Sequence, residues 1–295
     1  MFYFKYEMIM YKHIIYINYL YKLLEKIEKK YKIERKKPDL RYFRLIFFTL
    51  YTKEIKRAFN VYIQTLISPL VQVSIFLIIF NLAIGGAERG YVLNFPFIIF
   101  CCAGLIGSSV ITSSYAHSSS SMMVSKINGT IIDILTPPIS PAEVVTAIVL
   151  ASVTRSFIIV IISAIVFSLF IDLPIYNLLY IFVSVFLGGF ILGSVGLISG
   201  ILIYKFEGQA AVSNFFIQPL SLLSGTFYLT EKLPEIIQKI NIANPIYHIV
   251  NTIRFGFLGV ADTSIKFGLL YLVVLSFIFW FVAYILFAKG VKIKN

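Results

Sequence analysis

The chain has 295 residues, of which 59% are hydrophobic and only 14% are charged. Soluble globular proteins carry about a quarter of charged residues, so the composition excludes an ordinary soluble protein and predicts an integral membrane protein. The net charge is +12. Because the positive residues lie beside long apolar runs, we expect anionic membrane lipid, and not nucleic acid, as their partner.

The two cysteines, Cys101 and Cys102, are adjacent within an apolar run. A disulfide framework or a metal site would need further ligands near them, and the sequence offers none. We therefore expect both to be packing residues, with no metal site in the chain.

The N-terminal part is strongly basic. Residues 1–58 contain fifteen Lys and Arg and six Asp and Glu, a net charge of +9. Positive charge near the first crossing segment is retained in the cytoplasm. Residues 1–40 are therefore predicted to be a basic cytoplasmic extension, without a cleaved signal peptide.

A helix is predicted over residues 41–58, just before the first apolar run. One side carries apolar residues, namely Phe43, Phe47, Leu50, Tyr51, Ile55 and Ala58, and the other carries Arg41, Thr49, Lys53 and Lys56; Arg44 and Glu54 break the pattern. Such a helix suits the headgroup plane of the cytoplasmic leaflet. The alternative is a simple extension of the first span.

The hydropathy predicts an all-α integral membrane protein with six transmembrane helices. The spans are expected at about residues 61–84, 92–113, 150–171, 176–204, 210–223 and 267–288, and the rest of residues 41–295 belongs to the same domain. An even number of spans and the basic C-terminal tail place both termini in the cytoplasm.

Two spans carry unusual residues. In the third, the apolar block begins only at Phe157, so the helix must extend back past Arg155, whose side chain is expected to reach the inner headgroups. The fourth contains the pairs Gly189 with Gly193 and Gly196 with Gly200. These permit close helix packing, either within the subunit or between subunits.

A polar stretch over residues 113–140 separates the second and third spans, and the second cytoplasmic loop, residues 122–143, has dense helix-boundary signals. Thr130 can cap a helix over about 131–135, and Ser140, Pro141 and Glu143 form a capping box that begins the third span. The short helix carries four large apolar residues. They either pack on the protein's own surface or dock into the groove of a partner.

The segment between the fifth and sixth spans is broken at Ser224-Gly225 and at Asn244-Pro245. These breaks predict a re-entrant helical hairpin, with pieces near 231–241 and 246–258. Tyr247, His248 and Arg254 could line an exit path, or the hairpin could cap the bundle.

Several function classes are excluded by missing motifs. The sequence has no Gly-x-x-x-x-Gly-Lys-[Ser/Thr] loop, so it carries no ATPase motif of its own, and it has neither a Gly-x-Ser-x-Gly elbow nor paired carboxylates in a span. We therefore expect no catalytic residues. The predicted spans also have almost no ionisable groups at mid-depth, which argues against an ion-coupled transporter.

The order of these features resembles the membrane subunit of type-2 ABC transporters. The matching stretches are residues 49–57 (TLYTKEIKR), 64–69 (QTLISP), 127–141 (INGTIIDILTPPISP), 224–228 (SGTFY) and 244–248 (NPIYH). The resemblance covers the chain from about Tyr42 onwards.

This resemblance implies a permease subunit of an ATP-driven exporter, in a homodimer or a heterodimer, with two copies of a separate ATP-binding subunit. ATP would act only through that partner, and no cofactor would bind directly. The coupling helix would comprise Gly129, Thr130, Ile131, Ile132, Asp133, Ile134 and Leu135, flanked by Lys53, Glu54, Lys56 and Arg57 of the interfacial helix.

By the same resemblance, the external re-entrant hairpin would include Ser224, Gly225, Asn244, Pro245, Tyr247, His248 and Arg254. The cargo would be amphiphilic: a lipid-linked polysaccharide, a lipid or a hydrophobic drug. The location would be the cytoplasmic (inner) membrane. The rival functions are an ATP-independent channel or secondary transporter, and an intramembrane scaffold or enzyme.

Overall fold

The fold was analysed in a computed structural model, which describes residues 40–63, 67, 70, 71, 74, 75, 78, 79, 91–137 and 139–292, with side chains from Arg44 onwards. The chain divides into two compact units, Met1–Arg44 and Leu45–Asn295. The predicted extension over residues 1–40 lies outside the described residues except for its last position, and so does most of the predicted first span at 61–84.

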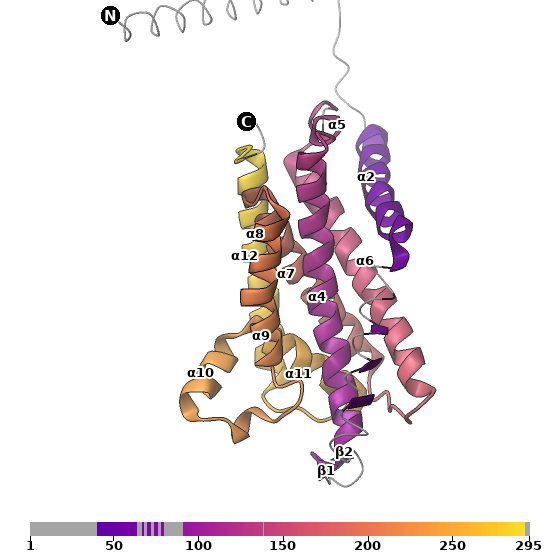
Figure 1. The fold of residues 1–295 in the computed structure, drawn as a ribbon, viewed down its shortest axis with the longest axis vertical. Coiled ribbons are helices and arrows are strands. Elements are labelled where there is room, and N and C mark those ends of the chain that lie inside the picture. The colour runs from indigo at the N-terminus through magenta and orange to yellow at the C-terminus, as the bar shows by residue number, and fades with distance from the viewer. Residues whose placement is uncertain are drawn as a thin grey trace, which may run out of the picture. The chain divides into compact units, whose positions relative to one another are not determined.

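The described residues are mostly helical (Figure 1). The elements in chain order are α2 (Leu40–Asn60), β1 (Tyr91–Val92), β2 (Phe95–Pro96), α4 (Phe97–Ile127), α5 (Ile131–Leu135), α6 (Pro141–Ser168), α7 (Leu178–Leu202), α8 (Phe206–Val212), the π-helix η2 (Ser213–Ile217), α9 (Gln218–Leu222), the 3₁₀-helix η3 (Thr230–Lys232), α10 (Glu235–Ala243), α11 (Pro245–Leu258) and α12 (Ile265–Ala288). The two strands form one antiparallel pair.

Four of the described helices, α4, α6, α7 and α12, are long and apolar enough to cross a membrane. Within their most apolar stretches, 78% of the residues of α4 and 67% of those of α7 are buried, against 17% in α12. The helices α4 and α7 therefore form the centre of the bundle. In contrast, α12 leaves most of its apolar surface exposed, as a helix in contact with lipid would.

The glycines of α7 account for its close packing against α4 and α6. A Cβ atom at Gly200 would lie 2.8 Å from the Ser119 carbonyl oxygen of α4, and one at Gly189 would lie 3.1 Å from the Cα atom of Val153 on α6. A side chain at Gly200 would therefore force a shift of the backbone, and one at Gly189 would leave little space between the helices. Of the two partners considered for these glycines, the structure places helices of the same subunit against them.

The second crossing helix was predicted wrongly at both ends. Residues 91–96 form the small hairpin, with Leu93 and Asn94 at positive φ in its turn, so α4 begins only at Phe97. At the other end, the stretch expected to be a polar loop continues α4 to Ile127. Several serine hydroxyls there donate hydrogen bonds to carbonyl oxygens three or four residues earlier, as Ser125 does to Ser121 (2.8 Å). Because serine side chains are small, they also allow tight helix packing.

The third crossing helix also differs from its prediction. The capping box of Ser140 and Glu143 is confirmed, and α6 therefore begins at Pro141 and ends at Ser168, before the predicted limit of 171. The expectation for Arg155 was wrong, because its side chain is only 6% exposed. Arg155 lines a small cavity with Ala58 and Phe59 of α2. Because α2 packs on α6 there, it covers the Arg155 side chain, which was expected to reach the headgroups.

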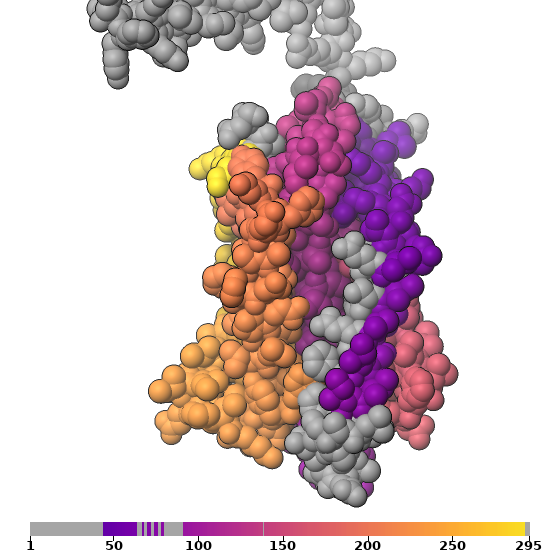
Figure 2. All heavy atoms as spheres, in the orientation of Figure 1, coloured from indigo at the N-terminus to yellow at the C-terminus, as the bar shows by residue number. Residues whose placement is uncertain are grey.

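The fifth predicted span, at 210–223, corresponds to three short helical pieces, α8, η2 and α9, over Phe206–Leu222. The π-helical turn in the middle is a local widening of the kind that often marks functional segments. The region after it contains α10 and α11, near the predicted pieces at 231–241 and 246–258. In Figures 1 and 2, α5 lies at one end of the bundle, and α10 and α11 lie at the other.

Candidate functional site

The short helix α5 stands between the ends of two long helices. After α4, the chain turns at Gly129, whose φ is +72°, a conformation that favours glycine. Thr130 occupies the N-cap position of α5, but it makes no capping bond; its hydroxyl lies 3.5 Å from the Ser125 carbonyl oxygen. The capping box of α6 follows directly. The protruding position of α5 is thus set by two helix ends that the sequence encodes.

The helix α5 has a buried and an exposed face. Ile131 and Ile134 are 7% and 4% exposed and belong to an apolar cluster with residues of α6, α7 and α12. Ile132 and Leu135 are 65% and 42% exposed, and Asp133 is exposed between them. The first of the two alternatives, packing on the protein's own surface, is therefore confirmed for Ile131 and Ile134, and docking stays a prediction for the exposed Ile132 and Leu135. Ile134, expected on the docking helix, belongs to the core.

Arg57 joins α2 to α4 and also forms an ion pair with Glu54 within α2. The Arg57 guanidinium lies 3.0 Å from the Glu54 carboxylate and donates to the His117 carbonyl oxygen (3.0 Å) and to the Ser120 hydroxyl (3.3 Å). A hydrogen bond of 2.6 Å between Tyr51 and Thr154 joins α2 to α6. Glu54, which broke the predicted amphipathic pattern, is 3% exposed. It lies on the packed face because Arg57 neutralises it there.

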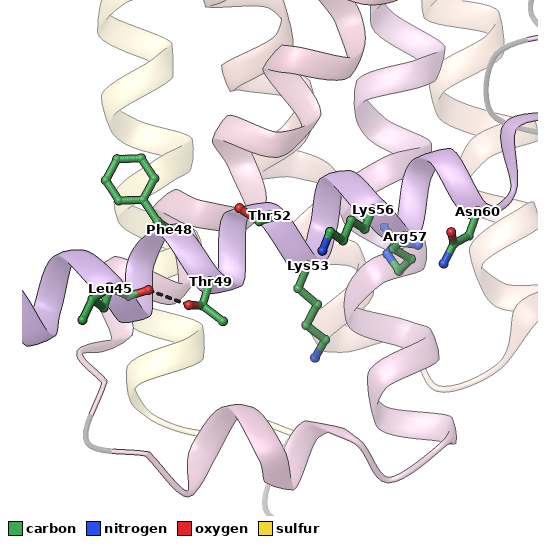
Figure 3. A pocket seen from close by; sticks show the side chains of 8 residues that line it. All are labelled: Leu45, Phe48, Thr49, Thr52, Lys53, Lys56, Arg57 and Asn60. Carbon is green, nitrogen blue, oxygen red and sulfur yellow. Dashed lines mark hydrogen bonds between the residues drawn. The ribbon is translucent and has the colours of Figure 1, made fainter.

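Lys53 and Lys56 lie on the opposite side of α2, exposed to solvent. They line an open groove of about 640 Å³ together with the exposed apolar side chains of Leu45 and Phe48. Figure 3 shows these side chains along α2, which crosses in front of the bundle in that view, and the 2.6 Å hydrogen bond from Thr49 to the Leu45 carbonyl oxygen. Of the four predicted residues of α2, Glu54 is buried and Lys53 and Lys56 are exposed, whereas Arg57 contacts α4 and also lines this groove.

The two predicted breaks of the hairpin have defined local causes. Gly225 adopts a φ of +73° after the buried Ser224. Asn244 caps α11, because its side chain accepts from the Ile246 amide (3.0 Å), and its amide nitrogen donates to the Leu220 carbonyl oxygen (3.0 Å). Pro245 follows in the first position of α11, where its missing N–H costs nothing.

The three polar residues of α11 that were predicted from the sequence face inward. Tyr247, His248 and Arg254 are each at most 1% exposed. His248 is paired with the Ile242 carbonyl oxygen at 2.8 Å. Tyr247 donates to the Asp262 carboxylate (3.0 Å), and burial raises the pKa of Tyr247 to about 12, so it stays neutral. These contacts join α11 to the end of α10 and to the segment before α12.

Arg254 joins the hairpin to α4. Its guanidinium lies 3.8 Å from the centre of the Phe100 ring, and its Nη2 donates to the Gly225 carbonyl oxygen at 2.6 Å. Burial lowers the pKa of Arg254 to about 10, so the side chain remains charged at neutral pH. The buried charge is therefore held by a ring face and a carbonyl dipole.

Sequence reasoning missed Asp262 and Lys126. The Asp262 carboxylate accepts from the Thr230 amide (2.9 Å) as well as from Tyr247. The signal was present, since Asp262 is the only acidic residue after Glu235. Lys126, in the last turn of α4, binds carbonyl oxygens at the end of α7. Its role depends on a contact 75 positions away, which no local pattern reveals.

Among the described side chains, no three His, Cys, Asp or Glu residues come close enough to hold a metal ion. Cys101 and Cys102 are not joined in a disulfide and lie buried in α4. The polar contacts of the described residues, around Arg57 and around Arg254, join helices and turns to one another.

Comparisons with known proteins agree with this architecture. The family described as "ABC-2 type transporter" matches residues 46–258. The chain is 28% identical to the inner membrane transport permease YadH of Escherichia coli (strain K12) over 247 residues. The aligned region covers 84% of this chain and 96% of YadH. YadH of Escherichia coli O157:H7 and that of Shigella flexneri match equally well. The chain belongs to the ABC-2 type transporter family.

Proposed function

We propose that the chain is the permease subunit of an ATP-driven exporter and that a separate ATP-binding subunit docks on α5. The observation that carries this proposal is the exposed face of α5, where Ile132 and Leu135 flank Asp133. A five-residue helix that exposes two large apolar side chains at the end of a bundle is suited to a groove in a partner. The sequence contains no phosphate-binding loop, so hydrolysis falls to that partner.

Dimerisation of two ATP-binding subunits on ATP would move two copies of α5, one in each permease subunit of a homodimer or heterodimer. Because Ile131 and Ile134 are embedded among α6, α7 and α12, a displacement of α5 would be passed to those helices. Binding energy at the nucleotide site would thereby shift a conformational equilibrium in the membrane. No cofactor binds to the permease itself in this account.

We place the protein in the inner membrane, where the name of YadH also places that relative. We orient the chain with both termini and α5 in the cytoplasm, so that α10 and α11 form an external re-entrant hairpin. Six crossings require segment 61–84 and the 206–222 segment in addition to the four long helices. The latter has 17 residues, about 26 Å at the usual helical rise, which nearly matches a hydrocarbon core of about 30 Å.

The cargo is an amphiphile, with a lipid-linked polysaccharide, a lipid or a hydrophobic drug as the candidates. The support is the apolar composition of the crossing helices, in which Arg155, midway along α6, is buried against α2. Crossing helices with so few charged groups favour a cargo with a large apolar part over a small ion.

We also propose that the outward face of α2 binds anionic lipid headgroups. Lys53 and Lys56 supply positive charge in a groove whose other side chains include Leu45 and Phe48. A helix with this combination lies in the headgroup plane, with its rings in the acyl region and its lysines at the phosphates. Residues 1–39 carry ten Lys and Arg against five Asp and Glu, so the chain's own N-terminal segment would be repelled from this groove.

The proposal is tested by purifying the tagged protein from its native membrane in mild detergent and identifying the bound proteins by mass spectrometry. We expect an ATP-binding subunit in equal amount and vanadate-sensitive ATP hydrolysis after reconstitution into liposomes. Transport that persists in liposomes without ATP, with no ATP-binding subunit in any detergent, would instead support the ATP-independent channel or secondary transporter.

A further inference from the structure

The last turn of α7 is capped by two lysines, one in the last turn of α4 and one in the segment after α12. The final carbonyl groups of a helix have no intrahelical donor. Here the Lys126 ammonium donates to the carbonyl oxygens of Ile201 (2.7 Å) and Ile203 (2.8 Å), and Lys292 donates to that of Leu202 (3.1 Å). Positive charge at this position also interacts favourably with the helix dipole.

Tyr204 completes the arrangement just after the end of α7. The Lys126 ammonium lies 4.4 Å from the centre of its ring and that of Lys292 lies 5.9 Å away. The Tyr204 hydroxyl donates to the Lys292 carbonyl oxygen at 2.9 Å. The turn between α7 and α8 is thus held by the end of α4 on one side and by the segment after α12 on the other.

Lys126 lies at the base of α5. It is one residue before the end of α4, and only Asn128, Gly129 and Thr130 separate that end from α5. The buried face of α5 shares its apolar cluster with Ile201, the residue whose carbonyl Lys126 binds. The base of α5 and the end of α7 are therefore joined by polar and by apolar contacts.

The turn that Lys126 holds leads directly into α8, η2 and α9. One turn into α8, Gln209 donates to the Tyr115 hydroxyl of α4 at 2.7 Å and lies 3.3 Å from the Ser199 hydroxyl of α7. The π-helical segment follows only a few residues later. Because π-helical turns are local irregularities in the helical hydrogen-bond ladder, this segment is the part of the bundle best suited to change shape.

We propose that Lys126 is a positioning residue that transmits displacement of α5 to the α7–α8 turn and so to the segment with the π-helix. The inference rests on the proposed function, in which α5 receives the ATP-binding subunit. Lys126 itself is half-buried behind α5 and contacts carbonyl groups of α7, so it is not part of the docking surface. Its removal would separate the movement of α5 from that of the turn without removing the partner.

The test is hydrogen–deuterium exchange of the complex with its ATP-binding subunit in lipid nanodiscs, with and without Mg-ATP and orthovanadate. Peptides covering residues 127–136 report on α5 and those covering 199–212 report on the turn. The variants are Lys126→Met, which removes the ammonium, Lys126→Arg, which keeps a cation with several donors, and Lys205→Met, which removes an exposed charge from the same turn.

In the wild type, nucleotide should change exchange in both peptides. In Lys126→Met the response of 127–136 should persist, whereas that of 199–212 should fall by about fivefold or more. Lys126→Arg should retain much of the response of the turn, and Lys205→Met all of it. Because a change between nucleotide states is measured, a loss of basal packing alone would not reproduce this pattern.

The inference is overturned if nucleotide changes exchange in peptide 199–212 equally in Lys126→Met and in the wild type. It is also overturned if nucleotide changes exchange in peptide 127–136 of the wild type but not in peptide 199–212. If no ATP-binding subunit binds the wild type, the proposed function fails instead. The melting temperature of each variant identifies any that does not fold. If Lys126→Met does not fold, Lys126→Gln, which also removes the charge, takes its place, and the same loss of the turn's response is expected.

Discussion

Glu54 and Arg57 lie one helical turn apart on α2, and their charged groups are 3.0 Å apart on the face that packs against α4. The Glu54 side chain is 4% exposed and that of Arg57 is 28% exposed. Removing one member of such a pair leaves the other charge partly buried without compensation, which costs more than the intact pair contributes. Glu54 therefore helps to hold Arg57, whose hydrogen bonds to His117 and Ser120 act as a lock between α2 and α4.

We expect Glu54→Gln to lower the melting temperature of the purified protein by roughly 2–8 °C, which corresponds to about 1–2 kcal/mol. Unfolding can be followed with a thiol-reactive dye, since Cys101 and Cys102 are 1% and 0% exposed in the folded protein. Lys53→Gln changes an exposed residue of the same helix and should leave the melting temperature within about 2 °C of the wild type. Equal effects of both variants would contradict the lock.

The close approach of α7 to α4 leads to a second prediction. A Cβ atom at Gly200 would meet the Ser119 carbonyl oxygen at 2.8 Å, and neither backbone can yield without moving its helix. Gly200→Ala should therefore lower the melting temperature, at an overpacking cost of about 1–3 kcal/mol.

Gly208→Ala is the matched control for Gly200→Ala. In α8 the added methyl group would meet only the Ile203 side chain, at 3.0 Å, and a side-chain methyl can turn away. Alanine also favours the helix over glycine by about 1 kcal/mol. We expect an unchanged or higher melting temperature for Gly208→Ala, and a fall as large as that of Gly200→Ala would show that the α4–α7 approach has no special importance.

The third prediction concerns Arg254, which stacks on Phe100 and donates to Gly225 at the same time. A lysine ammonium is a compact charge without a flat face, so it cannot make both contacts in the same geometry. Arg254→Lys should therefore lower the melting temperature by about 2–8 °C, for a cost of about 1–2 kcal/mol. The reverse exchange at an exposed position, Lys266→Arg, should have no effect. Retained stability in Arg254→Lys would mean that charge alone is sufficient at this position.

Local signals in the sequence predicted much of the fold. The capping box of Ser140 and Glu143, the glycine at 225 and the cap at Asn244 depend on residues within a few positions, and the structure has the corresponding helix boundaries. The short helix α5 has the bounds that its flanking signals indicated. Such features could be predicted because both their cause and their effect are local.

The wrong predictions came from tertiary contacts. The serine-rich half of α4 looked like a loop, because serine is a poor helix former in isolation; it is helical here because α6 and α7 pack on it. Arg155 was expected at the headgroups and is covered by α2. Ile134 was grouped with the exposed residues of α5, although only the packing of the whole bundle decides which face of so short a helix is buried.

The central claim is that the exposed face of α5 holds the ATP-binding subunit. It is tested most directly by co-purification of that subunit with two neighbouring variants, at a temperature at which both are folded. Ile132→Glu changes a side chain that is 65% exposed, and Ile134→Ala changes one that is 4% exposed.

We expect Ile132→Glu to retain about a tenth or less of the bound subunit with an unchanged melting temperature. Ile134→Ala should lose about 2–5 kcal/mol of stability, seen as a lower melting temperature, and keep the subunit bound. Full retention of the ATP-binding subunit by Ile132→Glu would contradict the account, because its docking surface would then lie elsewhere on the chain.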